Sequence, residues 1–340
     1  MTDGAAPSEI AYYYPEPYWL PREGGWIKSL LLFFDEVAIL LPDYMRGQHV
    51  VADPSLAEPL EGRGLLRVIE PEWFVDEPTT AQLGDVMESL VTSEAFDGVA
   101  EAAGFAELSM SRMGYRGLPD VAHRLYVELE RRGLAAETQD GVSIPMRPLV
   151  RSVYLIVLAQ LARDAGMRHQ LDLHPVTNGR GATEAFERFL ALEPMPSRGQ
   201  VVSFDLEVVS IDLDDVPLDD VLEYRRENGE VHRRYMQNLR KFALELSLLD
   251  EPDRVRAIDD RRTELQDEAR DLRRRAVESW RSAKDVAGFG LGITGAAWAL
   301  AASNPVPAAL AALGAGLKML PSKASGSAYS YLFKAKRALP

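Results

Sequence analysis

Cysteine is absent from this chain of 340 residues. Its absence excludes disulfide bonds, thiolate nucleophiles and cysteine-bound metal sites. The first residues, MTDGAAPSEIAYYYP, also lack the basic stretch and apolar run of a secretory signal. These absences predict a cytoplasmic protein. A peripheral membrane location is the alternative that the C-terminal end raises.

Catalytic sequence motifs are absent as well. The chain has no glycine-rich phosphate loop, no G-x-S-x-G nucleophile turn and no H-E-x-x-H zinc motif. The sequence therefore predicts no cofactor. A non-enzymatic protein is the first interpretation, and nothing in these absences excludes an enzyme that uses other residues.

Acidic residues are missing from one end of the chain only. Residues 286–340 contain no Asp or Glu, whereas residues 1–220 have a net charge of −20 within a total of −14. A body this acidic repels phosphate backbones, so nucleic-acid binding is not expected. Attraction to an anionic surface can come only from the C-terminal cations, which are Lys318, Lys323, Lys334, Lys336 and Arg337.

Residues 286–317 lack charges of either sign. Their composition predicts two apolar helical arms, 286–302 and 308–320, joined by a turn at 303–307. Each arm is shorter than the roughly 20 residues that span a bilayer. Three interpretations stay open: a hairpin buried in a soluble core, a hairpin that inserts into a membrane, or an interface between copies of the chain.

The first arm carries a stripe of small residues, Gly288, Gly292 and Gly295. Such a stripe lets another backbone approach closely, as in contacts between membrane helices. The predicted residues of membrane or partner contact are these three glycines, Trp298 and the five cations that follow the hairpin.

The rest of the chain has the patterns of an α+β protein. Alternating or continuous apolar runs predict strands over 10–14, 37–41, 170–174 and 201–211. Apolar residues at helical spacing predict helices over 26–34, 81–90, 119–132 and 149–165.

Two regions follow from these patterns. Residues 1–215 are predicted to form an acidic mixed α/β body, and residues 216–340 a helical region. Within the helical region, 216–285 is a helical hairpin, 286–320 the apolar hairpin and 321–340 a cationic tail.

The first of these hairpins has the seam of an antiparallel, coiled-coil-like pair. Its first arm repeats apolar residues at intervals of three and four, and its second at intervals of seven. These residues are Val231, Tyr235, Leu239, Phe242, Leu246 and Leu249, followed by Ile258, Leu265 and Leu272.

The opening of the chain resembles a bacterial family of unknown function. Members of that family begin with a YYP strand, then a helix with tryptophan, hydrophobic residues and lysine, then a strand that starts with aspartate and ends at proline. The matching residues here are Tyr12–Pro15, Trp26–Asp35 and Val37–Pro42, with further similarity at 64–71 and 217–226. The resemblance implies a shared fold over most of residues 10–250, and it implies no activity.

His169, Asp172 and His174 are the one close group of candidate metal ligands. Imidazole and carboxylate groups at this spacing can bind zinc or another divalent ion. They are equally compatible with the plain end of a strand. A second acidic group lacks the glycine and distal glutamate of a calcium loop, and it predicts a helix N-terminus instead. It comprises Asp212, Asp214, Asp215, Asp219 and Asp220.

Together these observations predict a non-enzymatic bacterial interaction or effector protein related to stress or defence. Its C-terminal helices would engage a protein partner, another copy of the chain or an anionic membrane. The alternative is a metal-dependent hydrolase that uses His169, Asp172 and His174.

Overall fold

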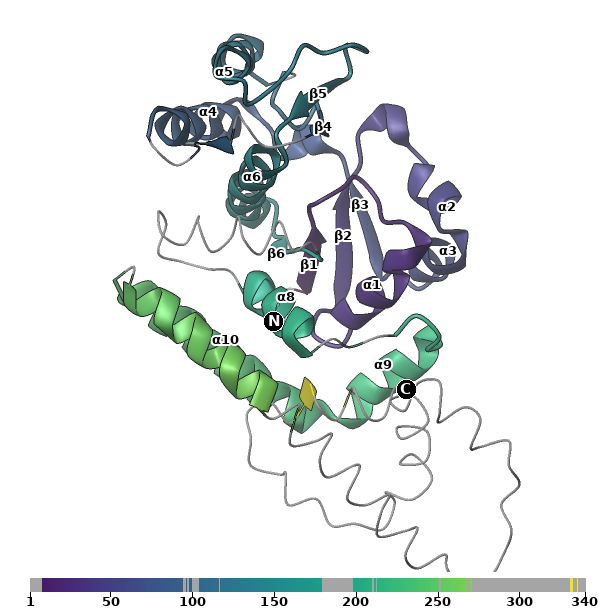
Figure 1. Ribbon diagram of the computed structural model, residues 1–340. Coiled ribbons are helices and arrows are strands. Elements are labelled where there is room, and N and C mark those ends of the chain that lie inside the picture. The colour runs from purple at the N-terminus through teal and green to yellow at the C-terminus, as the bar shows by residue number, and fades with distance from the viewer. Residues whose placement is uncertain are drawn as a thin grey trace, which may run out of the picture. The chain divides into compact units, whose positions relative to one another are not determined.

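A computed structural model describes most of residues 8–270, together with Tyr331, Leu332 and Ala335 (Figure 1). The residues within 8–270 that it leaves out are 94–95, 97, 100–103, 116, 179–197, 210, 212, 251 and 268–269. Contacts within the chain divide it into two units. The first comprises Met1–Gly24, Phe34–Ser203 and Ala243–Glu251, and the second comprises Gly25–Phe33, Phe204–Phe242 and Pro252–Pro340.

A parallel sheet forms the centre of the first unit. Its strands are β1 (Glu9–Tyr13), β2 (Glu36–Leu40), β3 (Leu66–Ile69) and β6 (Asp172–Val176), in the order β3-β2-β1-β6. Residues 37–40 of β2 are fully buried, as expected for a continuous apolar run in a parallel sheet covered on both faces. The sheet and the helical C-terminal elements confirm the predicted α+β class.

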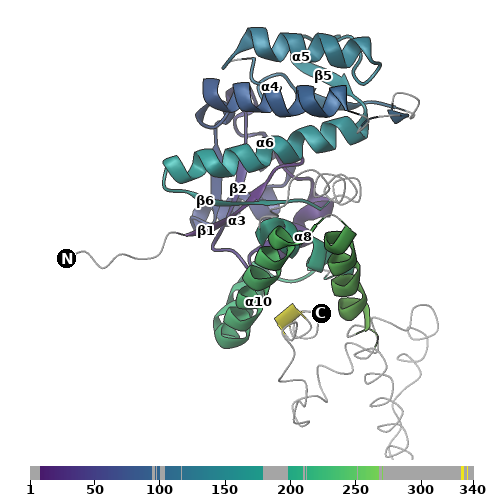
Figure 2. The same ribbon diagram turned by 90° about the vertical axis from the view of Figure 1, so that its left-hand side faces the viewer.

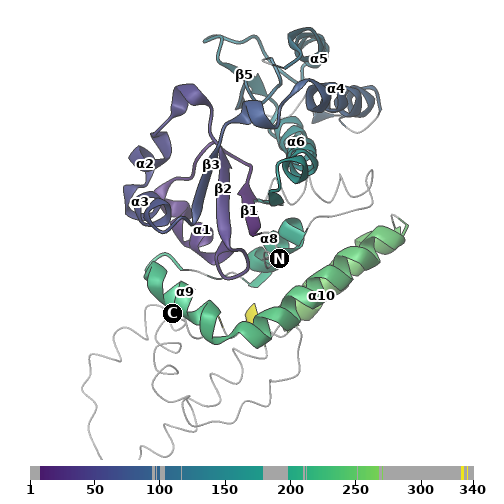
Figure 3. The same ribbon diagram turned by 180° about the vertical axis from the view of Figure 1, so that it is seen from behind.

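Successive strands are added first on one side of β1 and then on the other. The chain runs from β1 to β2 and β3, then returns to place β6 on the other side of β1. The segment before β3 contains α2 (Gln48–Ala52) and α3 (Pro54–Gly62), and the segment before β6 ends in α6 (Pro148–Arg168). Because parallel crossovers are right-handed, this reversal places α6 on the opposite side of the strands from α2 and α3 (Figure 3).

The long segment between β3 and β6 adds a second layer to this unit. Here α4 (Glu77–Thr92) packs between α5 (Pro119–Arg131) and α6, and α6 packs against β6 (Figure 2). Two short strands, β4 (Ala106–Ser109) and β5 (Ser143–Met146), pair antiparallel beside them. The unit also has three single-turn helices, η1 (Pro21–Glu23), η2 (Asp43–Met45) and η3 (Pro71–Trp73).

The second unit is helical in its described residues. It contains most of α1 (Gly24–Leu30), the second half of α8 (Arg198–Val209), and α9 (Leu218–Glu227). The greater part of α10 (Gly229–Leu248) and a helix over 252–267 complete it. Leu239 and Leu265 lie on these last two elements and are buried, and the seam between the two helices stays a prediction. Leu272, the last residue of that seam, lies outside the described residues.

One predicted strand is a helix. Within the valine-rich run over 201–211, residues 201–209 belong to α8 rather than to a strand. Its apolar residues are buried on nearly all sides of the helix, so the sequence lacks the polar face that distinguishes a helical from an alternating pattern. The predicted strand over 170–174 was also placed too early, because β6 begins at Asp172 and continues through Pro175 to Val176. An edge strand tolerates proline, and β6 is at the edge of the sheet.

Gly199→Ala is expected to destabilise the first unit by about 1–3 kcal/mol. A Cβ at this position would lie 2.3 Å from the Pro175 carbonyl oxygen and 2.8 Å from the His174 carbonyl oxygen. Both atoms are backbone of β6, so α8 must move away from the strand. The same change at Gly62, a helical position with no atom within 4 Å of its Cβ, should be neutral or stabilising by up to ~1 kcal/mol. Urea unfolding of both variants checks the difference, and equal stabilities would contradict the close contact.

Candidate functional site

One tyrosine near the C-terminus, Tyr331, is buried in the second unit. Tyr331 is 0 % exposed, and its hydroxyl donates to the Leu32 carbonyl oxygen at 2.8 Å. Its own carbonyl oxygen accepts a hydrogen bond of 3.2 Å from the hydroxyl of Tyr224. Leu332 and Ala335 are buried beside it. The described part of the tail is therefore held by specific contacts.

Four rings surround Tyr331, and we refer to them as the aromatic cluster. Their centroids lie between 5.2 and 6.2 Å from the centroid of Tyr331, and the ring of Phe33 meets it edge-on at an angle of 82°. Aromatic pairs at these distances contribute beyond the area that they bury. The cluster consists of Phe33, Tyr224, His232 and Tyr235.

Burial affects the ionisation of these tyrosines. It raises the pKa of Tyr331 and the pKa of Tyr224 far above the ordinary value for a phenol. Both hydroxyls therefore remain protonated donors throughout the physiological pH range, so the hydrogen bonds to Leu32 and from Tyr224 persist across that range.

The carboxyl edge of the sheet is where ligands bind in many parallel α/β proteins, at the point where the strand order reverses. In this chain the reversal lies between β1 and β6. Arg112 is fully buried at the carboxyl ends of the neighbouring strands β1 and β2, where it donates to the carbonyl oxygens of Tyr14 at 3.0 Å and Leu40 at 3.3 Å. Burial lowers the pKa of Arg112 below its usual value. Arg112 thus joins the ends of β1 and β2.

Two further charged residues at this edge, Arg151 and Glu23, also bind the protein itself. Arg151 donates to the Pro15 carbonyl oxygen at 2.9 Å and to Glu16 at 2.6 Å. Glu23 accepts from the Tyr13 hydroxyl at 3.3 Å and from the Asn178 side chain at 2.7 Å. These contacts hold the loop after β1 in place. The described polar contacts at this edge therefore have a structural role.

The predicted metal ligands do not all come together. The side chains of Asp172 and His174 lie 3.2 Å apart, and Arg198 contacts both, at 3.3 and 3.0 Å. The His169 ring packs instead against Trp73 and Phe74, with centroids 6.2 and 5.7 Å away. Among the residues that the structure describes, no group of three His, Asp or Glu side chains is placed to hold a metal ion.

The electrostatics of this pair follow from its neighbours. Burial lowers the pKa of His174, and the hydrogen bond with His174 lowers the pKa of Asp172. The guanidinium of Arg198 also lies 2.5 Å from Glu9 on β1. A cation already occupies the position next to both potential ligands. The arrangement ties the start of α8 to β1 and β6.

Three of the five aspartates of the second acidic group, Asp214, Asp219 and Asp220, lie at helix starts, whereas Asp212 lies outside the described residues. The Asp214 carboxylate accepts from the backbone amide of Gly25 at 2.8 Å. Asp219 and Asp220 occupy the first turn of α9, where negative charge is favourable. Lys28 donates to the carbonyl oxygens of Asp214 and Val216, which fixes α1 to this loop.

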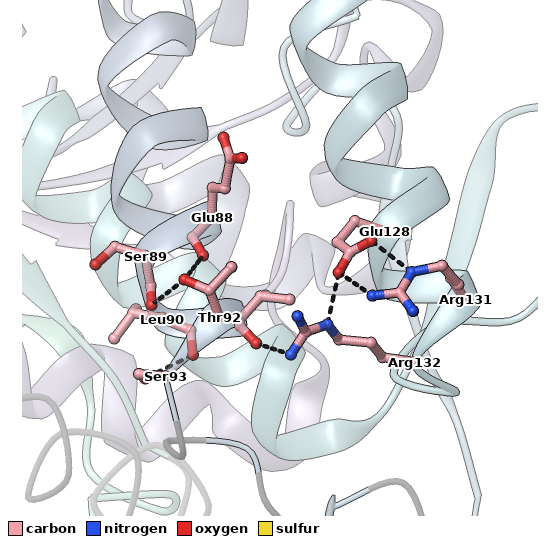
Figure 4. Close-up of polar contacts among 9 residues, drawn as sticks. Glu88, Ser89, Leu90, Thr92, Ser93, Glu128, Arg131 and Arg132 are labelled. Atoms are coloured by element: carbon pink, nitrogen blue, oxygen red, sulfur yellow. Dashed lines mark hydrogen bonds and ion pairs between the residues drawn. The ribbon is translucent and has the colours of Figure 1, made fainter.

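A further polar group joins the ends of α4 and α5 (Figure 4). Glu128 accepts from Arg131 at 2.6 Å and from Arg132 at 2.6 Å, and Arg132 also donates to the carbonyl oxygen of Val91. Hydrogen bonds from the two arginines lower the pKa of Glu128 to about 2. Thr92 donates to carbonyl oxygens of α4. These contacts satisfy the carboxyl end of α4, which is a structural role.

The predicted contact residues of the apolar hairpin lie outside the described residues. They are Gly288, Gly292, Gly295, Trp298, Lys318, Lys323, Lys334, Lys336 and Arg337. In the part of the chain that is described, no helix has the length and hydrophobicity needed to cross a bilayer.

Two important features were not predicted from the sequence. The aromatic residues near 331 are a signal of burial, but the surrounding lysines made the segment look like a solvated tail. Asp205 is the other, because it forms a buried ion pair with Arg261 at 2.5 Å. The carboxylate of Asp205, one of two acidic residues within the apolar run VVSFDLEVV, is the sequence signal that could have indicated this pair.

No protein-family description, curated protein or solved structure matches this chain. The resemblance of its opening to a bacterial family therefore stays a prediction.

Proposed function

We propose that this protein is a non-enzymatic interaction protein whose residues 286–340 bind an anionic membrane surface. The observation that carries the proposal is that the charge-free run is followed by five cations and lies between two attachment points on one unit. The first attachment is the buried pair of Asp205 and Arg261, and the second is Tyr331. Apolar residues followed by lysines suit the acyl and headgroup layers of a bilayer.

The contacts of the described residues support a non-enzymatic role. At the carboxyl edge of the sheet, Arg112, Arg151 and Glu23 all bind groups of the protein itself. The hydrolase alternative has less support, since His169 lies against Trp73 and Phe74, away from Asp172 and His174. A stress- or defence-related effector that exposes a sheltered apolar segment is the biological role we propose.

Vesicle flotation tests the proposal. The chain should float with vesicles of anionic phospholipid at low salt and much less with neutral vesicles, because each cation near an anionic surface contributes about 1 kcal/mol. Replacing the five tail cations with glutamine should abolish this preference. The matched control replaces five exposed arginines of the described helices and loops, which are Arg46, Arg131, Arg226, Arg234 and Arg256.

The outcomes distinguish the two possible binding targets of residues 286–340, a membrane or a second copy of the chain. Flotation that the tail substitution removes and the control substitution retains supports the membrane proposal. Absence of flotation at low salt, even in mild denaturant, contradicts it. If sedimentation then shows a dimer that the tail substitution dissociates, the segment is an interface between copies.

A further inference from the structure

We propose that the carboxyl edge of β1 and β2 binds a small soluble anion that carries a phosphate group. Its ligands would be the buried guanidinium of Arg112 and the hydroxyls of Ser111, Ser109 and Tyr44. This inference goes beyond the proposed function and does not depend on it, because all four residues belong to the first unit.

Arg112 is a buried cation whose hydrogen bonds leave part of its guanidinium unpaired. The residue is 1 % exposed, and its two hydrogen bonds go to the neutral carbonyl oxygens of Tyr14 and Leu40. Its Nε atom is buried and has no hydrogen-bond partner among the described residues. Burying a charge is costly unless an opposite charge compensates it, and carbonyl oxygens supply only part of that compensation. An anion bound beside Arg112 would complete it.

The carboxylate whose charge acts on Arg112 is engaged by another arginine. Burial is the main reason that the pKa of Arg112 is lowered, and the nearby charge of Arg151 lowers it further, whereas Glu16 acts in the opposite direction. The Glu16 carboxylate accepts from Arg151 at 2.6 Å, and its side chain is 51 % exposed. One half-exposed carboxylate thus faces two guanidinium groups. The charge at this edge is locally positive, although residues 1–220 are acidic as a whole.

Three hydroxyl groups connect solvent with the turn that carries Arg112. Tyr44 follows β2 in η2 and is 53 % exposed, and its hydroxyl oxygen lies 3.3 Å from that of Ser109. The Ser109 oxygen lies 2.8 Å from the hydroxyl oxygen of Ser111, which is 8 % exposed and precedes Arg112 in the chain. Hydroxyl hydrogens rotate to suit a ligand, so each of these groups can donate to an anion.

The turn that carries these donors is fixed by the protein itself. The backbone amide of Arg112 donates to the Ser109 carbonyl oxygen at 3.1 Å, which places Ser109, Ser111 and Arg112 on one tight turn. Two residues further on, Gly114 has a left-handed φ of 86°, and a Cβ there would lie 2.5 Å from the Thr80 methyl carbon on α4. Donors that are already in place lose little conformational entropy when a ligand binds.

Phosphate is the anion that suits this set of donors. An arginine and several hydroxyls can share the oxygens of one phosphate group, and hydrogen bonds to a charged acceptor are stronger than neutral ones. The carboxyl edge of a parallel sheet is also a common position for phosphate-bearing ligands. Because Arg112 is 1 % exposed, free phosphate or a small phosphomonoester fits this site better than a lipid headgroup held in a bilayer.

Calorimetric titration of the full-length protein with inorganic phosphate, at constant ionic strength, tests the site. The parent should bind phosphate, and Arg112→Met should weaken binding roughly tenfold or more because it removes a charged donor. Arg112→Lys keeps the charge and should weaken binding less. Ser111→Ala and Tyr44→Phe each remove one hydroxyl and should weaken binding roughly two- to tenfold.

Two matched controls lie in the same unit, away from this edge. Arg131→Met removes an exposed arginine that already pairs with Glu128, and Ser247→Ala removes an exposed hydroxyl on α10. Both should bind phosphate as the parent does. Circular dichroism identifies the variants that fold.

Several outcomes would overturn the site. They are absence of binding by the parent at millimolar phosphate, unchanged binding by folded Arg112→Met, and an equal loss in Arg131→Met, which would indicate non-specific attraction. If Arg112→Met does not fold, the hydroxyl variants decide, and unchanged binding by both Ser111→Ala and Tyr44→Phe overturns the proposal.

Two further measurements identify the source of the phosphate group. A nucleoside monophosphate that binds more tightly than inorganic phosphate supports a phosphomonoester as the ligand, and one that binds more weakly supports free phosphate. Folded Arg112→Met should float with anionic vesicles as the parent does, since its tail cations are unchanged. If Arg112→Met lost flotation while the parent kept it, the site would bind lipid headgroups, which contradicts a small soluble ligand.

Discussion

Asp205→Ala is expected to lower the free energy of unfolding by about 3–5 kcal/mol, because it leaves a buried guanidinium without its carboxylate. Asp205 is 0 % exposed and Arg261 3 %. Their side chains make two hydrogen bonds, and the hydroxyl of Tyr235 donates to the same carboxylate at 2.7 Å. Arg261 also lies over the ring of Phe242 at 4.4 Å. The pair thus joins α8, α10 and the helix over 252–267.

Urea unfolding followed by tryptophan fluorescence measures this loss. The matched control is Asp259→Ala, which breaks an exposed ion pair with Arg262. Arg262 is the residue after Arg261 in the same helix. Exposed pairs contribute about 0–1 kcal/mol, so the control should unfold close to the parent. A double replacement, Asp205→Leu with Arg261→Met, should recover most of the stability, because an apolar pair needs no compensating charge.

These variants test the ion pair against a simpler explanation. If Asp205→Ala cost no more than Asp259→Ala, the carboxylate would contribute little to the second unit. If the double replacement were as unstable as Asp205→Ala alone, lost packing volume would explain the effect better than an uncompensated charge.

Local elements of this fold were predictable where one pattern dominates. The apolar run of β2 and the length of α6 each leave one interpretation, and both agree with the structure. The run over 201–211 has no polar face, so sequence periodicity could not separate helix from strand. Its conformation depends on contacts distant in sequence, such as the approach of Gly199 to β6.

Side-chain partners were harder to predict than elements. Asp172 and His174 share a strand, so their proximity follows from the alternation of side chains. His169 precedes the strand at the C-terminus of α6, and its ring direction depends on Trp73 and Phe74, which are nearly a hundred residues earlier. Arg198, which contacts Asp172 and His174, likewise comes from a distant element, α8. Only the folded sheet brings these segments together.

Leu239→Asp and Leu265→Asp should each destabilise the protein by several kcal/mol, which combines the loss of buried apolar surface with an unpaired buried charge. Both leucines are 0 % exposed, one on α10 and the other on the helix over 252–267. Leu244→Asp and Leu248→Asp are matched controls on α10, because these leucines are 60 % and 78 % exposed. The controls should change the unfolding free energy by about 0.5 kcal/mol or less.

The pH dependence of Leu239→Asp distinguishes buried charge from lost volume. Burial disfavours the ionised carboxylate, so the pKa of the new aspartate should be higher in the folded than in the unfolded protein, where it is about 3.9. Its destabilisation should therefore grow as the pH rises above about 4 and become constant above the folded pKa. Leu239→Asn removes the same apolar group without a titrating charge, so its deficit relative to the parent should stay constant. Equal deficits of the two variants at every pH would show that the new carboxylate reaches solvent, which contradicts a buried seam between the two helices.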